Sequence, residues 1–154
     1  MTEGKEMSTK KKALRAGLAA TAAAAFTMGA AGAAQATPAG PGVVGKIISS
    51  TTVGKTDLVL REITIPPGQA TGWHYHDGQL FGKVKQGTLS HFDDTCASDG
   101  VYRKGSVIRE PAGSDQVHIG INRGRTPVVL EVLYVLPTGS PLSEDAANPG
   151  CSFQ

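Results

Sequence analysis

The stretch that decides the fold reads GQATGWHYHDGQLFGKVKQG and covers residues 68–87. His74 and His76 stand in it one residue apart. On an extended strand, side chains two positions apart project to the same face, so both imidazoles point the same way. Two neighbouring imidazoles supply half of a first-row metal site. The alternative is a pair of surface histidines beside Trp73 and Tyr75.

The chain around this stretch consists of short β-like runs. They are rich in apolar and β-branched residues and are bounded by Gly, Pro, Asp or Asn. No segment beyond residue 36 keeps a helical period over about ten residues. Many short strands at regular spacing predict an all-β sandwich or small barrel. The expected strands cover residues 43–53, 58–65, 72–76, 80–86, 88–92, 106–109, 117–121 and 128–136.

A second stretch also places chemically distinctive residues at fixed spacing, here glycine, proline, histidine and asparagine. The first has the form Gly68-x5-His74-x-His76-x10-Gly87, and the second has the form Gly105-x5-Pro111-x-Gly113-x4-His118-x3-Asn122. In this order they resemble the two motifs of the cupin family, and the resemblance covers about residues 63–136. The sequence is identified as that of a small secreted bacterial cupin-domain protein of the cupin-2, conserved-barrel type. The resemblance implies an antiparallel jelly-roll barrel with a metal site inside it, whose ligands would be His74, His76 and His118.

One departure from the family pattern concerns the fourth ligand. The first motif normally carries a glutamate four or five residues after its second histidine, and here Leu80 and Phe81 occupy those positions. Counting from His76 along an unbroken strand points Leu80 inward, so an apolar side chain would replace the carboxylate. Gln79 would offer an amide oxygen instead if the turn at residues 77–78 resets the strand parity. We therefore expect a pocket near Gln79 and Leu80 and a site of three histidines.

A second departure concerns the third histidine. The spacing from Gly113 to His118 is two residues longer than the common form, and an ungapped count would place Gln116 at the ligand position. We prefer His118, because a shift of two residues keeps the same face of a strand. The spacing from His118 to Asn122 is also the usual one for the family.

Three neutral imidazoles would leave a divalent ion with its full charge and about three open positions in an octahedral shell. Such a site suits Fe, Mn, Ni or Co, and a tetrahedral Zn ion with one bound water fits the same ligands. By resemblance to cupin dioxygenases that lack the carboxylate, we expect a small-molecule dioxygenase-type enzyme. A non-catalytic small-molecule or sugar-binding cupin module and an isomerase of the same fold stay open as alternatives. The sequence assigns no catalytic residue, does not decide whether the protein is an enzyme, and leaves a homodimer open.

Two further titratable residues lie within the predicted strands. We expect His91 to be a solvated or hydrogen-bonded imidazole rather than a fourth ligand. Glu131 alternates with apolar residues and could be a buried acid with a raised pKa. We favour an outward position on a barrel strand, or a pairing with Arg109.

The N-terminal region has the pattern of a secretory signal peptide. A lysine cluster at residues 10–12 precedes an uncharged, alanine-rich run, and Ala34-Gln35-Ala36 places small residues where a signal peptidase reads them. We expect cleavage after Ala36 and export by the general secretory route to the extracellular side. An alanine-rich membrane anchor is the alternative. The mature chain would then comprise a linker over residues 37–45, the barrel over 46–137 and a C-terminal tail over 138–154.

The charged residues are unevenly distributed. Residues 1–36 hold five of the 15 basic residues and two of the 13 acidic residues, which leaves 10 and 11 for the rest of the chain. The mature chain therefore has no basic stripe that would bind nucleic acid. We expect a small-molecule ligand or substrate instead, and no membrane contact after signal cleavage.

Cys96 and Cys151 are the only cysteines in the sequence. An even number of cysteines in an exported chain predicts a disulfide. Such a bond would tie down the polar C-terminal tail. The two cysteines lack CxxC spacing, so we do not expect them to be metal ligands.

Overall fold

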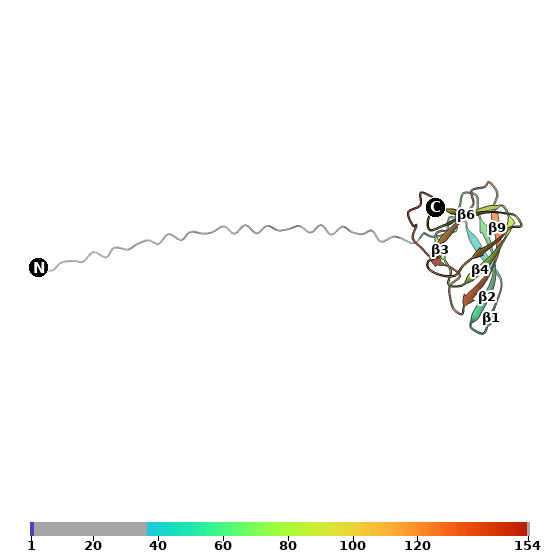
Figure 1. Ribbon diagram of the computed structural model, residues 1–154, viewed down its shortest axis with the longest axis horizontal. Coiled ribbons are helices and arrows are strands. Elements are labelled where there is room, and N and C mark those ends of the chain that lie inside the picture. The colour runs from blue at the N-terminus through green and yellow to red at the C-terminus, as the bar shows by residue number, and fades with distance from the viewer. Residues whose placement is uncertain (2–36, 154) are drawn as a thin grey trace. The chain divides into compact units, whose positions relative to one another are not determined.

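The computed structural model describes Met1 and residues 37–153, and the predicted signal peptide lies outside the described residues. The described part forms ten β-strands and no helix (Figure 1). It consequently holds no helix long and apolar enough to cross a membrane. The strands are β1 (Val44–Val53), β2 (Thr56–Ile65), β3 (His74–Tyr75), β4 (Gln79–Gln86), β5 (Thr88–Asp93), β6 (Ser98–Arg103), β7 (Val107–Glu110), β8 (His118–Ile121), β9 (Val128–Pro137) and β10 (Glu144–Asp145).

The strands form two five-stranded antiparallel sheets. One has the order β1-β2-β9-β4-β7, and the other has the order β10-β3-β8-β5-β6. The longest ladder joins β2 to β9 and runs without a shift from the pair Thr56 and Pro137 to the pair Ile65 and Val128. Strands that are distant in sequence are therefore neighbours, as in a jelly roll. The expected all-β, antiparallel fold is confirmed.

The core between the sheets follows the two-residue period of the strands. In β9 the alternate residues Val128, Leu130, Val132, Tyr134 and Leu136 are all buried. A second apolar cluster gathers around Trp73 and Ile119. Each strand therefore presents one face inward, and a polar or charged residue on that face is a candidate for a functional site.

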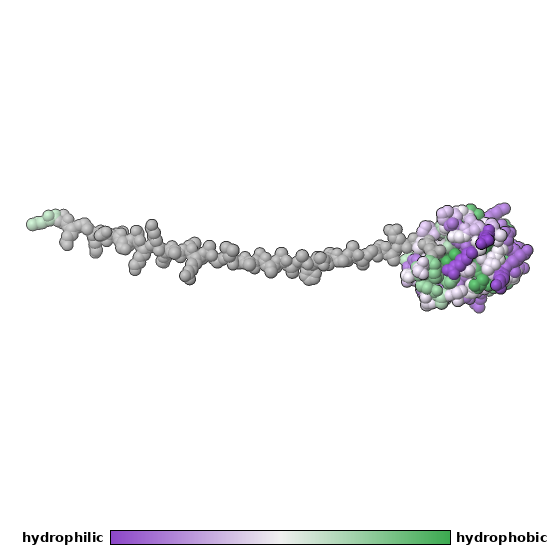
Figure 2. Space-filling view, turned by 90° about the horizontal axis from the view of Figure 1, so that it is seen from above, coloured by the Kyte–Doolittle hydropathy of each residue, from purple (hydrophilic) through white to green (hydrophobic). Residues whose placement is uncertain are grey.

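The surface carries no single apolar patch on the side seen in Figure 2. Hydrophobic residues form a few separate areas among hydrophilic ones in that view. Scattered exposed apolar residues are normal for a folded protein. The interior of the barrel is therefore the better place to search for function.

Two of the ten strands are absent from the sequence-based expectation. β6 has the sequence SDGVYR, whose polar residues mask any apolar alternation. β10 spans two residues, and its pairing with β3 depends on long-range contact rather than on its own sequence. Both strands lie in the same sheet, next to the strands that carry the histidines.

The tail after β9 is attached to the barrel at several points. Cys96 and Cys151 form a disulfide with a Cα–Cα distance of 5.5 Å. The Ala146 backbone N–H donates to the Trp73 carbonyl at 2.8 Å, and the Thr37 N–H donates to the Ala146 carbonyl at 2.9 Å. The predicted domain boundaries at residues 45 and 137 stay predictions.

Candidate metal centre

Three histidines converge inside the barrel from two neighbouring strands. His74 on β3 pairs directly with His118 on β8, and His76 follows β3 by one residue. The ring centroid of His74 lies 4.8 Å from that of His76 and 4.5 Å from that of His118. Cross-strand partners share one face of a sheet, so the short β3–β8 pairing brings the third histidine to the first two.

Hydrogen bonds fix the orientation of each of these rings. The Nδ1 atoms of His74, His76 and His118 lie 2.7–2.8 Å from the carbonyl oxygens of Gly72, Leu142 and Gln116, respectively. A carbonyl only accepts, so each Nδ1 must carry the proton and each Nε2 keeps its lone pair. This is the arrangement in which metal-binding histidines are commonly held.

The Nε2 atoms of His76 and His118 are buried and have no hydrogen-bond partner. An unsatisfied buried atom of this kind lowers the stability of the folded state by about 1–3 kcal/mol, which suggests that a ligand normally satisfies it. A bound cation would satisfy these lone pairs. The residues present therefore fit a metal ion.

Glu110 supplies a carboxylate to the same group. One ligand atom each from His74, His76, Glu110 and His118 fit within 4.8 Å of one another. A Glu110 oxygen lies 3.2 Å from Nε2 of His76 and 3.5 Å from Nε2 of His118, and the Glu110 side chain is only 16% exposed. The donor set is three imidazole nitrogens and one carboxylate oxygen.

The expectation of a site without a carboxylate is therefore wrong. Leu80 points inward as expected, at 2% exposure, but Glu110 is its direct cross-strand partner in the β4–β7 ladder. Partners of this kind share a face, with Cβ atoms roughly 5 Å apart. The carboxylate that the first motif lacks is thus delivered by the neighbouring strand. A site with Glu110 carries one positive charge less than the predicted one.

Glu110 could have been found from strand parity. It alternates with Ile108, which is buried at 3% exposure, so Glu110 starts on the inward face of β7. It also stands directly before Pro111, inside the second motif. The missing information was the register that sets β7 against β4, which no local pattern specifies.

The other sequence-predicted residues do not belong to the ligand group. Gln79 pairs with Val135, whose neighbours Tyr134 and Leu136 are the inward residues of β9, so Gln79 faces outward and the strand parity is not reset. Gln79 and Leu80 do not line the cavities described below. Glu131 faces outward as favoured, and its partner is Lys85 at 3.5 Å rather than Arg109.

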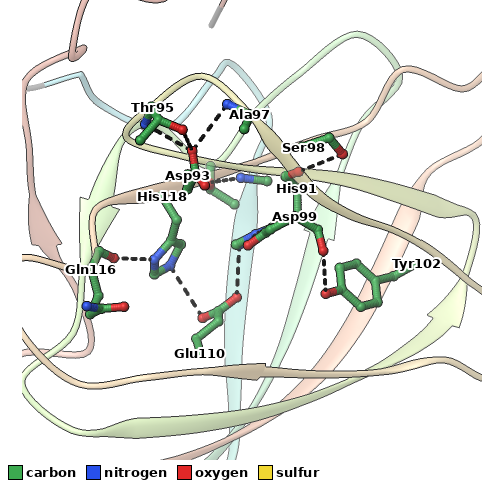
Figure 3. Close-up of polar contacts among 12 residues, drawn as sticks. His91, Asp93, Thr95, Ala97, Ser98, Asp99, Tyr102, Glu110, Gln116 and His118 are labelled. Carbon is green, nitrogen blue, oxygen red and sulfur yellow. Dashed lines mark hydrogen bonds and ion pairs between the residues drawn. The ribbon is translucent and has the colours of Figure 1, made fainter.

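His91 is hydrogen-bonded, and it lies closer to the site than its sequence position suggests. Its Nδ1 is 2.7 Å from an Asp99 oxygen, and its Nε2 is 3.5 Å from the second Glu110 oxygen. Figure 3 shows Glu110 between His91 and His118. His91 is 3% exposed, so the solvated alternative is excluded. It contacts the carboxylate of the ligand group without belonging to that group.

The site without an ion has strongly perturbed acid–base behaviour. Burial, aided by the neighbouring charges of His118 and His76, lowers the pKa of His74 to about 3. Burial opposes ionisation of Glu110, but the neighbouring imidazoles of His118, His76 and His91 hold its pKa well below its usual range. Burial also opposes protonation of His91, yet Asp99 and Glu110 raise its pKa to about 9. At neutral pH the site thus offers a neutral His74 and an ionised Glu110, both ready to bind a cation.

Two cavities reach the ligand group. The first, of about 150 Å³, is lined by His74 and His76 together with Ala39, Val43, Val44, Gly45, Arg61, Ile63, Thr71, Tyr134, Ser143 and Asp145. The second, of about 260 Å³, is lined by Glu110 and His118 together with His91, Asp93, Asp94, Asp99, Arg109, Pro111, Asp115, Gln116 and Val117. We call them the arginine cavity, after Arg61, and the acidic cavity, after its carboxylates.

The fold and the site define a small antiparallel β-barrel with a His–Glu cluster that could hold a metal. Residues 61–136 match the cupin domain family, and the chain is a cupin-domain protein of the cupin-2 type. This confirms the family identification. No curated protein matches the sequence.

Solved structures show the same fold at low sequence identity. One is a conserved protein with a double-stranded β-helix domain from Klebsiella pneumoniae, at 21% identity and a TM-score of 0.54, covering 71% of this chain and 88% of that one. KdgF from Halomonas sp. has 19% identity and a TM-score of 0.50, covering 62% and 80%. A cupin 2 conserved barrel domain protein from Salinispora arenicola has 14% identity and a TM-score of 0.50, covering 60% and 74%.

Proposed function

We propose that the protein is a secreted metal-dependent cupin that binds one divalent first-row ion through His74, His76, Glu110 and His118 and catalyses a dioxygenase-type reaction on a small molecule. The observation that carries the proposal is the convergence of buried, unpartnered Nε2 atoms on the partly buried carboxylate of Glu110. Imidazole nitrogens with one carboxylate oxygen suit Fe, Mn, Co, Ni or Zn.

The ion would supply Lewis acidity and, for a redox-active metal, electron transfer. The chain's own residues hold its ligands in place. Backbone carbonyls of Gly72, Leu142 and Gln116 fix the three imidazoles. His91 contacts the second oxygen of Glu110, which favours one carboxylate orientation. The apolar core around Leu80 and Val84 keeps bulk water from that side of the site.

Metal content of the full-length protein, exported by its own host and purified without chelator, tests the first half of the proposal. We expect about one ion per chain after dialysis. A protein that retains none of Fe, Mn, Co, Ni or Zn, even after refolding with each, would refute the metal centre. Oxygen consumption with candidate substrates, dependent on Fe(II), tests the second half.

A proton-transfer reaction is the second candidate, and Tyr134 favours it. The Tyr134 ring lies 5.9 Å from the His76 ring, and both line the arginine cavity. Burial raises the pKa of the Tyr134 hydroxyl despite Arg61, so the group stays protonated and able to donate. Turnover in the absence of oxygen would favour this isomerase-type reaction, and ligand binding without turnover would favour a binding module.

Export is also part of the proposal. It is supported by the signal-peptide pattern of residues 1–36 and by a disulfide, which persists in oxidising compartments. N-terminal sequencing of exported protein should begin at Thr37, within a few residues. A sequence beginning near Met1 would contradict cleavage.

A further inference from the structure

Arg61 is a charged residue on the inward face of a barrel strand. It lies on β2 between Val59 and Ile63 at alternate positions, and its cross-strand partner on β9 is the buried Val132. Residues paired in this way share a face, so the Arg61 side chain starts toward the interior. An inward arginine is costly unless a partner compensates its charge.

No carboxylate among the described residues lies within 4.0 Å of the Arg61 guanidinium. Tyr134 lines the same cavity, and burial raises the pKa of its hydroxyl despite Arg61, so this neighbour of the guanidinium is neutral. A guanidinium has five N–H donors, so most of its hydrogen-bonding capacity is left for something else. The cavity that it lines also exposes His74 and His76, two members of the ligand group.

The backbone leaves room for the guanidinium at this position. A Cβ atom at Gly45 on β1 would collide with the guanidinium group of Arg61. Because Gly45 has no side chain, Arg61 can lie along the wall of the cavity. The lining also includes Thr71 and Ser143, whose hydroxyls are neutral polar groups.

We propose that the arginine cavity binds the anionic group of the substrate, so that the substrate is a small carboxylate or similar oxyanion. A further oxygen atom of the substrate then faces the metal ligands. The inference rests on the proposed metal centre and names the substrate class for it. Arg61 holds the acidic group with paired N–H donors, and the Tyr134 hydroxyl donates a further hydrogen bond. A cavity of about 150 Å³ is smaller than a drug-sized pocket, so the ligand has few atoms.

The charge of the two cavities supports this direction of approach. The acidic cavity has five carboxylates on its lining against two basic side chains, Arg109 and His91, so it repels an anion. The arginine cavity has one carboxylate on its lining, Asp145, which is exposed to solvent and does not pair with Arg61. An anion therefore reaches the histidines from the Arg61 side.

Glycolate and glycolamide are matched probes for this inference, since they differ in charge but hardly in size. Titrations of the zinc-loaded full-length protein, followed by calorimetry or ligand-observed NMR, should show glycolate binding at least about tenfold tighter than glycolamide. Arg61→Gln should weaken glycolate binding and reduce that preference without lowering zinc content, since only the charge of the zinc ion then favours glycolate. Arg125→Gln, at an exposed arginine in the turn between β8 and β9, is the matched control and should keep it.

Equal binding of the two probes by the wild type, or an undiminished preference in Arg61→Gln, would overturn the inference. If Arg61→Gln does not fold, Arg61→Lys decides, because an ammonium cannot offer two parallel donors. Its preference should fall below half of the wild-type value, and an unchanged preference would overturn the inference. A wild type that retains no zinc would refute the metal centre alone, since the same titrations on metal-free protein still test Arg61.

Discussion

The arginine cavity and the acidic cavity end at the same His–Glu cluster but differ in charge. The first presents the Arg61 guanidinium and the Tyr134 hydroxyl beside His74 and His76. The second presents Glu110 and four aspartates beside His91 and His118. Because electrostatic potential steers ions toward the surface of opposite sign, an anion and a cation would approach the cluster from different sides.

The difference in charge indicates that ligand choice and metal affinity depend on residues on different sides of the cluster. The histidine ligands are divided between the two sides, with His74 and His76 on the arginine side and His118 on the acidic side, whereas the single carboxylate of the ligand group belongs to the acidic side. The positive group that could select a substrate belongs to the other. Substitutions on the acidic side should therefore change metal binding, and substitutions around Arg61 should change ligand choice.

The largest expected effect is on metal retention. His118→Ala removes a ligand on the acidic side, and we expect zinc affinity to fall by more than about a hundredfold, beyond the 10–100-fold cost of losing a supporting residue. Competition with a chromophoric chelator would measure it. Glu131→Gln is the control, since Glu131 faces outward and pairs with Lys85. Equal zinc affinity in His118→Ala and the control would refute the assignment of His118.

The next effect concerns the disulfide, which joins segments that border the two cavities. Cys96 follows Asp93 and Asp94 of the acidic cavity, and Cys151 follows Ser143 and Asp145 of the other. Cys151→Ala should lower the free energy of unfolding by about 2–4 kcal/mol, as measured by urea denaturation. Reductant should lower the wild type by a similar amount and leave the variant unchanged. Two free thiols in native wild-type protein would contradict the bond.

A smaller effect tests the position of the carboxylate. Glu110→Leu should weaken zinc binding by at least the roughly tenfold cost of losing a supporting residue, because the ligand group loses its only carboxylate. Adding Leu80→Glu to that variant places a carboxylate on the directly opposite residue of the ladder and should regain much of the affinity. Phe81→Glu is the matched control, since Phe81 is exposed on the other face. Recovery by Phe81→Glu, or none by Leu80→Glu, would contradict the register argument.

The smallest effect is a pH dependence of the metal-free protein. The pKa of His91 is raised to about 9 in the folded state, so its contribution to stability is present below pH 6.5 and is lost as the pH rises toward 9. The wild type should therefore lose more unfolding free energy than His91→Gln between pH 6.5 and pH 9. Urea denaturation in chelator would show it. A difference in unfolding free energy between the two proteins that stays constant with pH would contradict the interaction of His91 with Asp99 and Glu110.

Sequence alone could predict the parts of the site that depend on strand parity and motif spacing. His74 and His76 share a face because they are two residues apart, and Leu80 is inward for the same reason. The resemblance to the cupin motifs added His118, which the structure places directly opposite His74. The all-β fold followed from the short runs between turn residues.

Sequence alone could not predict the parts that depend on register between distant strands. Glu110 joins the site because β7 pairs with β4, and Arg61 lines its cavity because β2 pairs with β9. His91 reaches Glu110 across the barrel, from the opposite sheet. A local pattern gives the face on which such a residue lies but not its neighbours on the next strand.

The most direct test of the central claim is a crystal structure of zinc-loaded protein with anomalous data collected at the zinc edge. We predict one ion about 2.0–2.2 Å from Nε2 of His74, His76 and His118 and from one oxygen of Glu110. An ion bound elsewhere, or one bound by the histidines with Glu110 turned away, would contradict it.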